Sequence, residues 1–255
     1  MPKAITALLA TALAAAVPAF VFSAPAQEVE RDVPYVPTPQ PVVDAMLNLA
    51  GVKAGDYHID LGCGDGRIVV TAAKRYGTRG LGVDIDPERI REARFNADAA
   101  GVLDRVEFRR GDLFRTDISR ASVLALYLLP EVNMRLRPTI LARLRPGTRV
   151  VSHDFAMGDW PPDRRVEVPD EGSTVYLWIV PANVAGRWRV TGPGGGAQEI
   201  RLEQRFQLLG PSVRDGRVTG DRVTFMLPDG RRFAARASGE TMTGAGGWRA
   251  ERIGD

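Results

Sequence analysis

A chain of 255 residues with 44% hydrophobic and 25% charged residues is long enough to bury one large domain and a small one, and this composition excludes a disordered chain. The formal net charge of +3 comes from dispersed arginines in residues 184–255, a pattern that does not indicate nucleic-acid binding. With one cysteine, Cys63, and two histidines, His58 and His153, the chain excludes an internal disulfide, and no metal site is expected.

Residues 1–26 have the pattern of a secretory signal peptide. Lys3 precedes an uncharged stretch over residues 4–22 that is rich in Ala and Leu, and Ala24-Pro25-Ala26 is a small-x-small cleavage pattern. We expect a mature chain that begins at Gln27 in the periplasm or outside the cell. The alternative is a retained membrane anchor, and the charge asymmetry across the apolar stretch directs the rest of the chain outward in both cases.

Residues 27–183 alternate between helix and strand patterns after a proline-rich lead-in. Alternation of this kind predicts a doubly wound α/β fold, whose mostly parallel seven-stranded sheet carries helices on both faces and ends in an antiparallel hairpin. The expected helices cover residues 42–50, 67–76, 86–100 and 136–144. The expected strands cover residues 58–61, 80–83, 106–108, 123–127, 149–152, 164–168 and 174–180.

Residues 184–255 have a different texture, with short runs of alternating apolar residues separated by glycine pairs and by Asp-Gly-Arg turns at Asp215 and Asp229. This pattern predicts a small antiparallel β domain, either a barrel or a sandwich, without a catalytic constellation. The expected strands cover residues 187–190, 199–208, 213–218, 222–225, 232–237 and 248–252.

A glycine loop, Asp60-Leu61-Gly62-Cys63-Gly64-Asp65-Gly66, joins the first strand to the following helix. Its Gly-x-Gly-x-Gly spacing is tighter than the Gly-x-Gly-x-x-Gly of dinucleotide-binding folds. Asp60 and Asp65 would repel an anionic pyrophosphate, whereas they would attract the sulfonium and ammonium groups of S-adenosylmethionine. The loop therefore favours a cationic nucleoside ligand.

Two more acids end neighbouring strands. Asp84 ends the second strand, where a carboxylate can accept hydrogen bonds from both ribose hydroxyls, and Asp112 follows the third, where it can accept from an adenine amino group. Together with the residues that follow these acids, the predicted cofactor-binding set is Asp60, Gly62, Cys63, Gly64, Gly66, Asp84, Ile85, Asp112 and Leu113.

In this order and spacing, the glycine loop, Asp84 and Gly111-Asp112 resemble the cofactor motifs of class I S-adenosylmethionine-dependent methyltransferases. The resemblance covers about residues 35–181. It implies S-adenosyl-L-methionine as the cofactor, a Rossmann-like sheet and methyl transfer as the reaction.

A narrower resemblance rests on Tyr35-Val36-Pro37-Thr38, Leu126-Tyr127-Leu128-Leu129-Pro130 and Gly158-Asp159-Trp160. These segments are similar to small protein-lysine methyltransferases related to the ATP-synthase c-subunit enzyme and, more distantly, to histone-lysine enzymes of the Dot type. The similarity implies a lysine amine as acceptor and proximity to a membrane. The fourth strand is not followed by the Asn/Asp-Pro-Pro-aromatic motif of amino-methyltransferases that act on adenine or glutamine, so no nucleic-acid partner is expected.

Tyr35, Tyr127 and Trp160 are the candidate residues of the acceptor channel, because aromatic faces stabilise an ammonium by about 0.5–2 kcal/mol. Ordinary packing is the alternative for each of them. His153 is either a base for another acceptor or a structural histidine. Two other functions stay open, a methyltransferase for a small molecule and an exported binding protein that keeps the fold without catalysis. The sequence gives no indication of oligomeric state.

Overall fold

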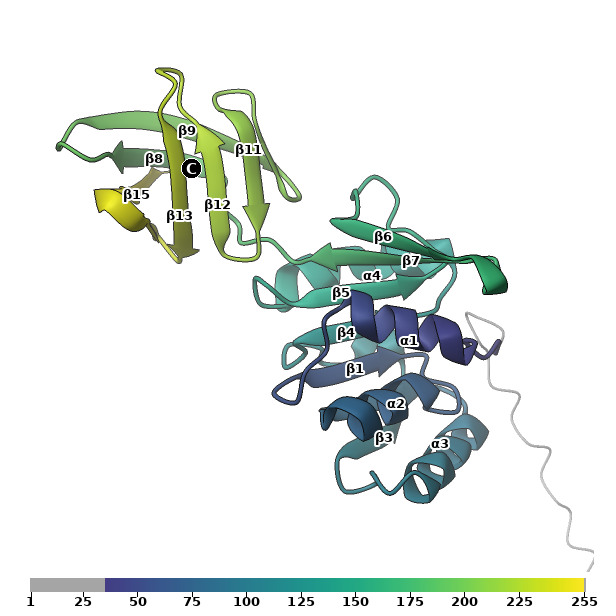
Figure 1. The fold of residues 1–255 in the computed structure, drawn as a ribbon. Helices are drawn as coiled ribbons and strands as arrows, with labels where there is room; N and C mark the ends of the chain where they lie inside the picture. The colour runs from purple at the N-terminus through teal and green to yellow at the C-terminus, as the bar shows by residue number, and fades with distance from the viewer. Residues whose placement is uncertain (1–34, 255) are drawn as a thin grey trace, which may run out of the picture. The chain divides into compact units, whose positions relative to one another are not determined.

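The computed structural model describes residues 35–254, which form a seven-stranded sheet with four helices, followed by an eight-stranded barrel (Figure 1). The predicted signal peptide, residues 1–26, lies outside the described residues. Among residues 35–254, no helix has the length and apolar composition needed to cross a bilayer.

The sheet has the strand order β3-β2-β1-β4-β5-β7-β6. Its first five strands are parallel, and β7 runs antiparallel to both β5 and β6. This confirms the predicted mostly parallel sheet that ends in an antiparallel hairpin. The strands are β1 (Tyr57–Leu61), β2 (Arg79–Asp84), β3 (Val106–Arg110), β4 (Val123–Leu126), β5 (Arg149–His153), β6 (Arg164–Val168) and β7 (Ser173–Ile179).

Helices cover both faces of the sheet, as predicted (Figure 1). On one face, α1 packs against β5, β6 and β7, while α2 and α3 cover the strands from β1 to β3. On the other face, α4 residues such as Leu136 share a core cluster with Leu124 and Val150. The helices are α1 (Gln40–Leu49), α2 (Arg67–Tyr76), α3 (Pro87–Ala99) and α4 (Pro130–Arg143).

The start of α4 differs from its prediction. The helix begins at Pro130 and not at Leu136. Proline is favoured at the first position of a helix, where its missing N–H would have no intrahelical partner, so Pro130 fits the first turn. The helix therefore begins immediately after the short segment that follows β4 and contains Tyr127.

The C-terminal part closes into a barrel and not a sandwich, with the strand order β10-β11-β12-β13-β14-β15-β8-β9. Trp188, Val218 and Phe233 are among the side chains that fill its core. Two of its short strands were missed in the sequence: β10, which is separated from β9 by a turn at Phe206, and β14. The strands are β8 (Gly186–Thr191), β9 (Ala197–Arg205), β10 (Leu208–Gly210), β11 (Arg214–Thr219), β12 (Arg222–Met226), β13 (Arg232–Ser238), β14 (Thr241–Thr243) and β15 (Arg249–Gly254).

Candidate functional site

A cleft with about 890 Å³ of open space lies at the edge of the sheet where the parallel strands end. Ligands bind at this edge in open α/β sheets, because the loops there diverge from the carboxyl ends of the strands. The lining comes from the segment before α1, the glycine loop, and the ends of β2, β3 and β4. It comprises residues 35–38, 60, 62–65, 67, 68, 84–86, 89, 111–113, 127 and 128.

The cleft brings together the predicted cofactor-binding residues with one exception, Gly66. Gly66 has φ 77° and is the N-cap of α2. A Cβ at this position would lie 2.7 Å from Cε1 of Phe108. Gly66 therefore allows the turn into α2 and its close packing against β3, and it does not itself line the cleft.

The glycine loop is held to the end of β2 by Asp84. The Gly64 N–H donates to Oδ2 of Asp84 at 2.9 Å, and the Asp86 N–H donates to Oδ1 at 2.9 Å. The ring of Tyr35 lies so close to Gly64 that a Cβ there would overlap it. Gly64 has φ 52°, so both its conformation and this contact require glycine.

Asp60 is the deepest acid of the cleft, with 1% of its surface exposed. Burial, together with the charges of Asp84 and Asp65, raises its pKa to about 8. Its Oδ2 atom is buried and has no hydrogen-bond partner. A buried carboxyl without a partner, beside two further acids, suits a ligand that brings positive charge and N–H donors.

Asp112 occupies the expected place after β3, and its side chain also has a structural task. Its Oδ1 accepts from the Phe114 N–H at 2.8 Å and so caps the 3-10 turn η1 (Leu113–Arg115). Oδ2 lies 3.6 Å from Nε of Arg115. The cap fixes the carboxylate in the wall of the cleft beside Leu113.

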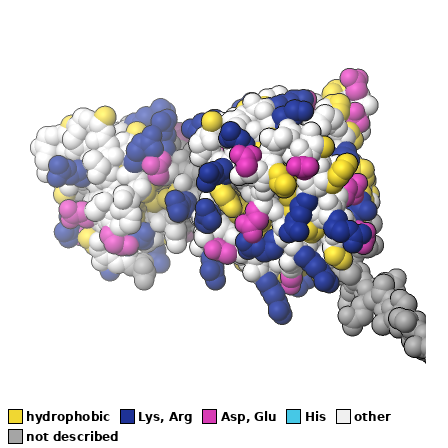
Figure 2. Space-filling model, turned by 90° about the horizontal axis from the view of Figure 1, so that it is seen from below, with side chains coloured by type: hydrophobic (Ala, Val, Ile, Leu, Met, Phe, Trp, Pro, Cys, Tyr) yellow, Lys and Arg dark blue, Asp and Glu magenta, His cyan; other side chains and the backbone are white. Residues whose placement is uncertain are grey.

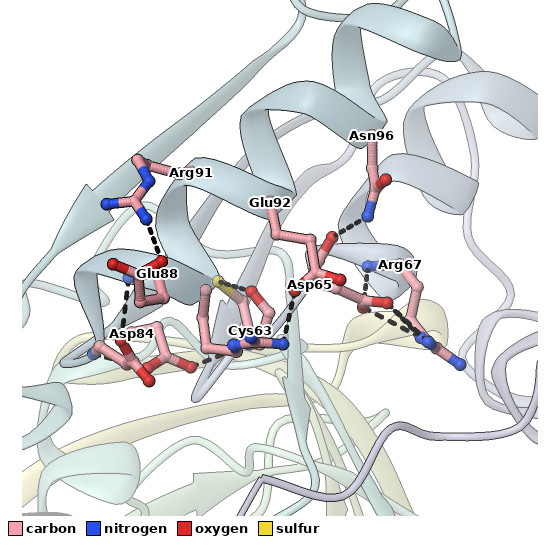
Figure 3. Close-up of polar contacts among 11 residues, drawn as sticks. Cys63, Asp65, Arg67, Asp84, Glu88, Arg91, Glu92 and Asn96 are labelled. Carbon is pink, nitrogen blue, oxygen red and sulfur yellow. Dashed lines mark hydrogen bonds and ion pairs between the residues drawn. The ribbon is translucent and has the colours of Figure 1, made fainter.

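The segment before α1 is tied across the glycine loop by Arg67. Two nitrogens of Arg67 bind the Asp65 carboxylate, and Nη1 donates to the Thr38 carbonyl at 2.9 Å. Figure 3 shows Asp65 between Arg67 on α2 and Asn96 on α3, whose amide donates to the Asp65 carbonyl at 3.0 Å. Thr38, Asp65 and Arg67 were absent from the predicted set, although the lead-in motif and the loop acid were recognised.

Tyr35 and Tyr127 both line the cleft, as expected for residues of an acceptor channel. The guanidinium of Arg89 lies 4.5 Å from the centre of the Tyr35 ring. Burial and the charge of Asp154 raise the pKa of the Tyr127 hydroxyl, so this phenol is neutral at neutral pH. The two rings therefore offer uncharged aromatic surface on two separate segments of the cleft wall.

Trp160 does not line this cleft. Its side chain is fully buried in the core on the α4 side of the sheet, where it packs with Trp178 and Phe206. Its indole N–H donates to Oε1 of Gln207 at 2.9 Å. Trp160 is thus a core residue, and its expected place in the acceptor channel is corrected.

His153 at the end of β5 has both ring nitrogens within hydrogen-bond distance of hydroxyls. Nδ1 lies 3.3 Å from Oγ1 of Thr38, and Nε2 lies 3.0 Å from Oγ of Ser173. Burial lowers the pKa of the ring, against an opposing effect of Asp154. These contacts favour the structural interpretation of His153 over a catalytic base. In residues 35–254, no group of three or more His, Cys, Asp or Glu side chains is arranged to hold a metal ion.

The strand order, the antiparallel seventh strand, and the glycine loop and acids at the ends of β1, β2 and β3 define a class I S-adenosylmethionine-dependent methyltransferase. The buried Asp60 Oδ2 atom, which has no hydrogen-bond partner, and the close-packed glycine loop fit S-adenosyl-L-methionine as the cofactor.

Comparison with known proteins agrees with this class. Residues 60–164 match the family model "ANTKMT methyltransferase domain". The chain is 47% identical over 151 residues to a protein-lysine N-methyltransferase from Saccharolobus islandicus, a match that covers 58% of this chain and 94% of the relative. It is 34% identical over 155 residues to the adenine nucleotide translocase lysine N-methyltransferase of Mus musculus, covering 60% of this chain and 65% of the relative.

A solved structure is also similar. The crystal structure of an RNA methyltransferase from Salinibacter ruber in complex with S-adenosyl-L-homocysteine is 58% identical to this chain, with a TM-score of 0.57. The similarity covers 58% of this chain and 96% of that chain. The protein therefore belongs to the methyltransferase family that contains the Saccharolobus protein-lysine N-methyltransferase, and it is an S-adenosylmethionine-dependent methyltransferase.

Proposed function

We propose that the protein transfers a methyl group from S-adenosylmethionine to the side-chain amine of a lysine in a protein. The observation that carries this proposal is the 47% identity with the Saccharolobus protein-lysine N-methyltransferase over almost all of that relative. The cleft is compatible with it, because Tyr35 and Tyr127 offer aromatic surface to a cationic side chain.

The residues that line the cleft divide into groups by their expected contacts with the cofactor. Asp60 lies where it can accept hydrogen bonds from an ammonium group, and Asp84 where it can accept from ribose hydroxyls. Ile85 and Leu113 offer apolar surface beside Asp112 for an adenine ring. Bound in this way, S-adenosylmethionine supplies a methyl group that is activated by a sulfonium centre.

The protein's contribution to catalysis is alignment and exclusion of water, since a neutral amine needs no activation beyond loss of its proton. The proton of a lysine ammonium leaves to water before transfer, and burial beside a cation lowers the pKa of the amine from its ordinary value of about 10.4. Tyr127 forms the wall against which the amine is aligned. A strong base is not required, in agreement with the structural contacts of His153.

The test is methyl transfer from labelled S-adenosylmethionine to three separate fractions: envelope proteins, RNA and small-molecule extracts. We expect label in protein, and peptide mapping by mass spectrometry should place it on lysine. Label found only in another fraction, or on another protein side chain, would overturn the lysine proposal while leaving the methyltransferase class intact.

RNA is the second candidate acceptor, and the observation in its favour is the 58% identity with the Salinibacter RNA methyltransferase. On the face shown in Figure 2, the Lys and Arg side chains are interspersed with Asp and Glu. A surface for the phosphate backbone is typically dominated by positive charge. The RNA arm of the labelling experiment tests this alternative directly.

We further propose that the enzyme acts outside the cytosol on a protein at or near a membrane. The support is the signal-peptide pattern formed by Lys3, the apolar residues 4–22 and Ala24-Pro25-Ala26. N-terminal sequencing of the protein from fractionated cells should find a chain that starts at Gln27 outside the cytosol. A cytosolic chain that starts at Met1 would contradict this proposal.

A further inference from the structure

Asp154 is the first residue after β5, and its backbone conformation is unusual for a residue other than glycine. It has φ 58°, in the left-handed region. Its N–H donates to the Thr174 carbonyl at 2.7 Å, and its Oδ1 accepts from the Thr174 N–H at 2.8 Å. This two-way connection to β7 fixes the direction of the carboxylate.

The second carboxylate oxygen of Asp154 is not paired with a permanent positive charge. Oδ2 lies 3.3 Å from Nε2 of His153, a nitrogen that is also 3.0 Å from Oγ of Ser173. Within residues 35–254, neither a lysine nor an arginine forms an ion pair with Asp154. In contrast, Asp65, which lines the cleft, is bound by Arg67. The Oδ2 atom of Asp154 therefore has no Lys or Arg partner within the described residues.

Asp154 is not itself among the residues that line the cleft, but it follows His153, whose ring stacks on Tyr127 in the cleft wall. The rings of Tyr127 and His153 stack with their centres 3.8 Å apart, and Asp154 directly follows His153 in the chain. Burial and, after it, the charge of Asp154 raise the pKa of the Tyr127 hydroxyl. One third of the Asp154 side chain is exposed, so solvent reaches the carboxylate.

We propose that Asp154 is the charge partner of the acceptor, binding the ammonium group of a lysine side chain next to Tyr127. This inference rests on the proposed function, because only a cationic acceptor would use such a partner. Asp154 attracts the ammonium form, the proton then leaves to water, and the neutral amine is aligned against the Tyr127 ring. The residue determines specificity for an amine and takes no part in bond formation.

A purely structural role is the competing interpretation, since Asp154 also binds the Thr174 N–H. Asp154→Asn separates the two interpretations. Asparagine tolerates the left-handed conformation, and its side-chain oxygen can still accept from Thr174, so the variant removes the charge and leaves the connection. Asp98→Asn is the matched control, because Asp98 is an exposed acid near the C-terminal end of α3 and does not line the cleft.

The experiment titrates the full-length protein, saturated with S-adenosyl-L-homocysteine, with n-butylammonium chloride as a probe for the lysine side chain, and follows binding by ligand-detected NMR. We expect saturable binding to the wild type and to Asp98→Asn, and about tenfold weaker binding to Asp154→Asn, a difference of about 1.4 kcal/mol. The neutral probe n-butanol should bind the wild type and Asp154→Asn equally. Thermal unfolding of each variant checks that the fold is intact.

Two results would overturn the inference: equal n-butylammonium affinity for Asp154→Asn and the wild type, or the absence of saturable binding to the wild type. Both are distinct from failure of the proposed function, which is decided by mapping the labelled methyl group. Labelled lysine together with an unaffected Asp154→Asn titration would remove Asp154 from the acceptor site and leave lysine methylation standing.

Discussion

The rings of Tyr127 and His153 stack with their centres 3.8 Å apart and their planes at 29°. This contact joins the residue after β4 to the last residue of β5, two neighbouring parallel strands. His153 is held in turn by the hydroxyls of Thr38 and Ser173. Three separate segments of the chain therefore set the position of the Tyr127 ring, which is the rigidity that an aligning wall requires.

Tyr127→Phe should keep most of the activity, whereas Tyr127→Ala should be less active. Phenylalanine retains the ring that stacks on His153 and faces the acceptor, and alanine removes both contacts. The expected loss for alanine is about 3- to 30-fold in kcat/KM, corresponding to the roughly 0.5–2 kcal/mol of an aromatic–cation contact. Steady-state kinetics on the labelled acceptor protein measure this difference. Equal kinetics for the two variants would remove the Tyr127 ring from the acceptor site.

Asp84→Ala should weaken binding of S-adenosyl-L-homocysteine by about 2–4 kcal/mol, because a carboxylate that accepts hydrogen bonds from ribose hydroxyls contributes about 1.5–3 kcal/mol for each bond. The variant also releases the Gly64 N–H, which now donates to Asp84. Calorimetry measures the affinity, with Asp98→Asn as the control. An unchanged affinity of Asp84→Ala would mean that the ribose is bound elsewhere.

Much of the fold was predictable because its signals are local. Strands such as β4 and β7 contain short apolar runs, and the glycine loop with Asp60, Asp84 and Asp112 lies at the ends of β1, β2 and β3. The turn at Phe206, with φ 55°, could not be anticipated, because this conformation is uncommon for a bulky residue. Because of this turn, the single strand predicted over residues 199–208 is two strands, β9 and β10.

The parts of the site that were missed depend on long-range contacts. Arg67 joins the cleft through the Thr38 carbonyl, 29 positions away in the chain. The motif around Trp160 resembles that of small protein-lysine methyltransferases and so predicts a place in the acceptor channel. In the structure, however, the indole N–H donates a hydrogen bond to Gln207, 47 positions away. Neither partner leaves a periodic or compositional trace in the sequence, so only the tertiary structure reveals them.

Cofactor affinity should rise with pH between about 6 and 9 and then level off. In the free protein, burial and the neighbouring acids Asp84 and Asp65 raise the pKa of Asp60 to about 8, well above the ordinary value of 3.8. A bound cation favours the ionised carboxylate, so binding below pH 8 releases a proton. The same shift makes the free protein less stable as pH rises from about 4 to 8, because over this range the folded state holds the proton more tightly than the unfolded chain.

Calorimetry with S-adenosylmethionine in buffers of different ionisation enthalpy counts the released protons. Asp60→Asn should abolish the part of the release that belongs to this carboxyl and flatten the pH dependence. Titration of the ligand's own amine is common to both proteins and cancels in the comparison. Identical proton release from Asp60→Asn and the wild type would show that Asp60 is already ionised in the free protein.

His58 should contribute a loss of stability in mild acid, opposite in sign to the contribution of Asp60 over the same pH range. Its side chain is fully buried in β1, both ring nitrogens lack hydrogen-bond partners, and burial lowers its pKa to about 4 from the ordinary 6.5. The unfolded chain therefore binds a proton more readily than the folded protein between these two values. The stability that depends on neutral His58 is fully present above pH 6.5 and is lost as pH falls toward 4, by up to about 3 kcal/mol.

His58→Leu should remove this contribution, so that the difference in the free energy of unfolding between the variant and the wild type changes as pH falls from 6.5 to 4, because leucine fits an apolar environment, carries no titratable group and leaves no hydrogen bond broken. Urea unfolding followed at several pH values between 4.5 and 8 measures the free energy of unfolding for both proteins. At pH 7 and above, where His58 is neutral in both the folded and unfolded states, the difference between the proteins should be constant, and this range serves as the internal control.

If the free energy of unfolding of His58→Leu fell as steeply as that of the wild type between pH 6.5 and 4.5, the acid sensitivity would have to come from other groups. The carboxyl of Asp56 could not be that source, because hydrogen bonds from Lys53, Ser122 and Arg149 outweigh its burial and lower its pKa. Asp56 changes the free energy of unfolding only below pH 3.8, so its contribution is separated from that of His58 along the pH axis.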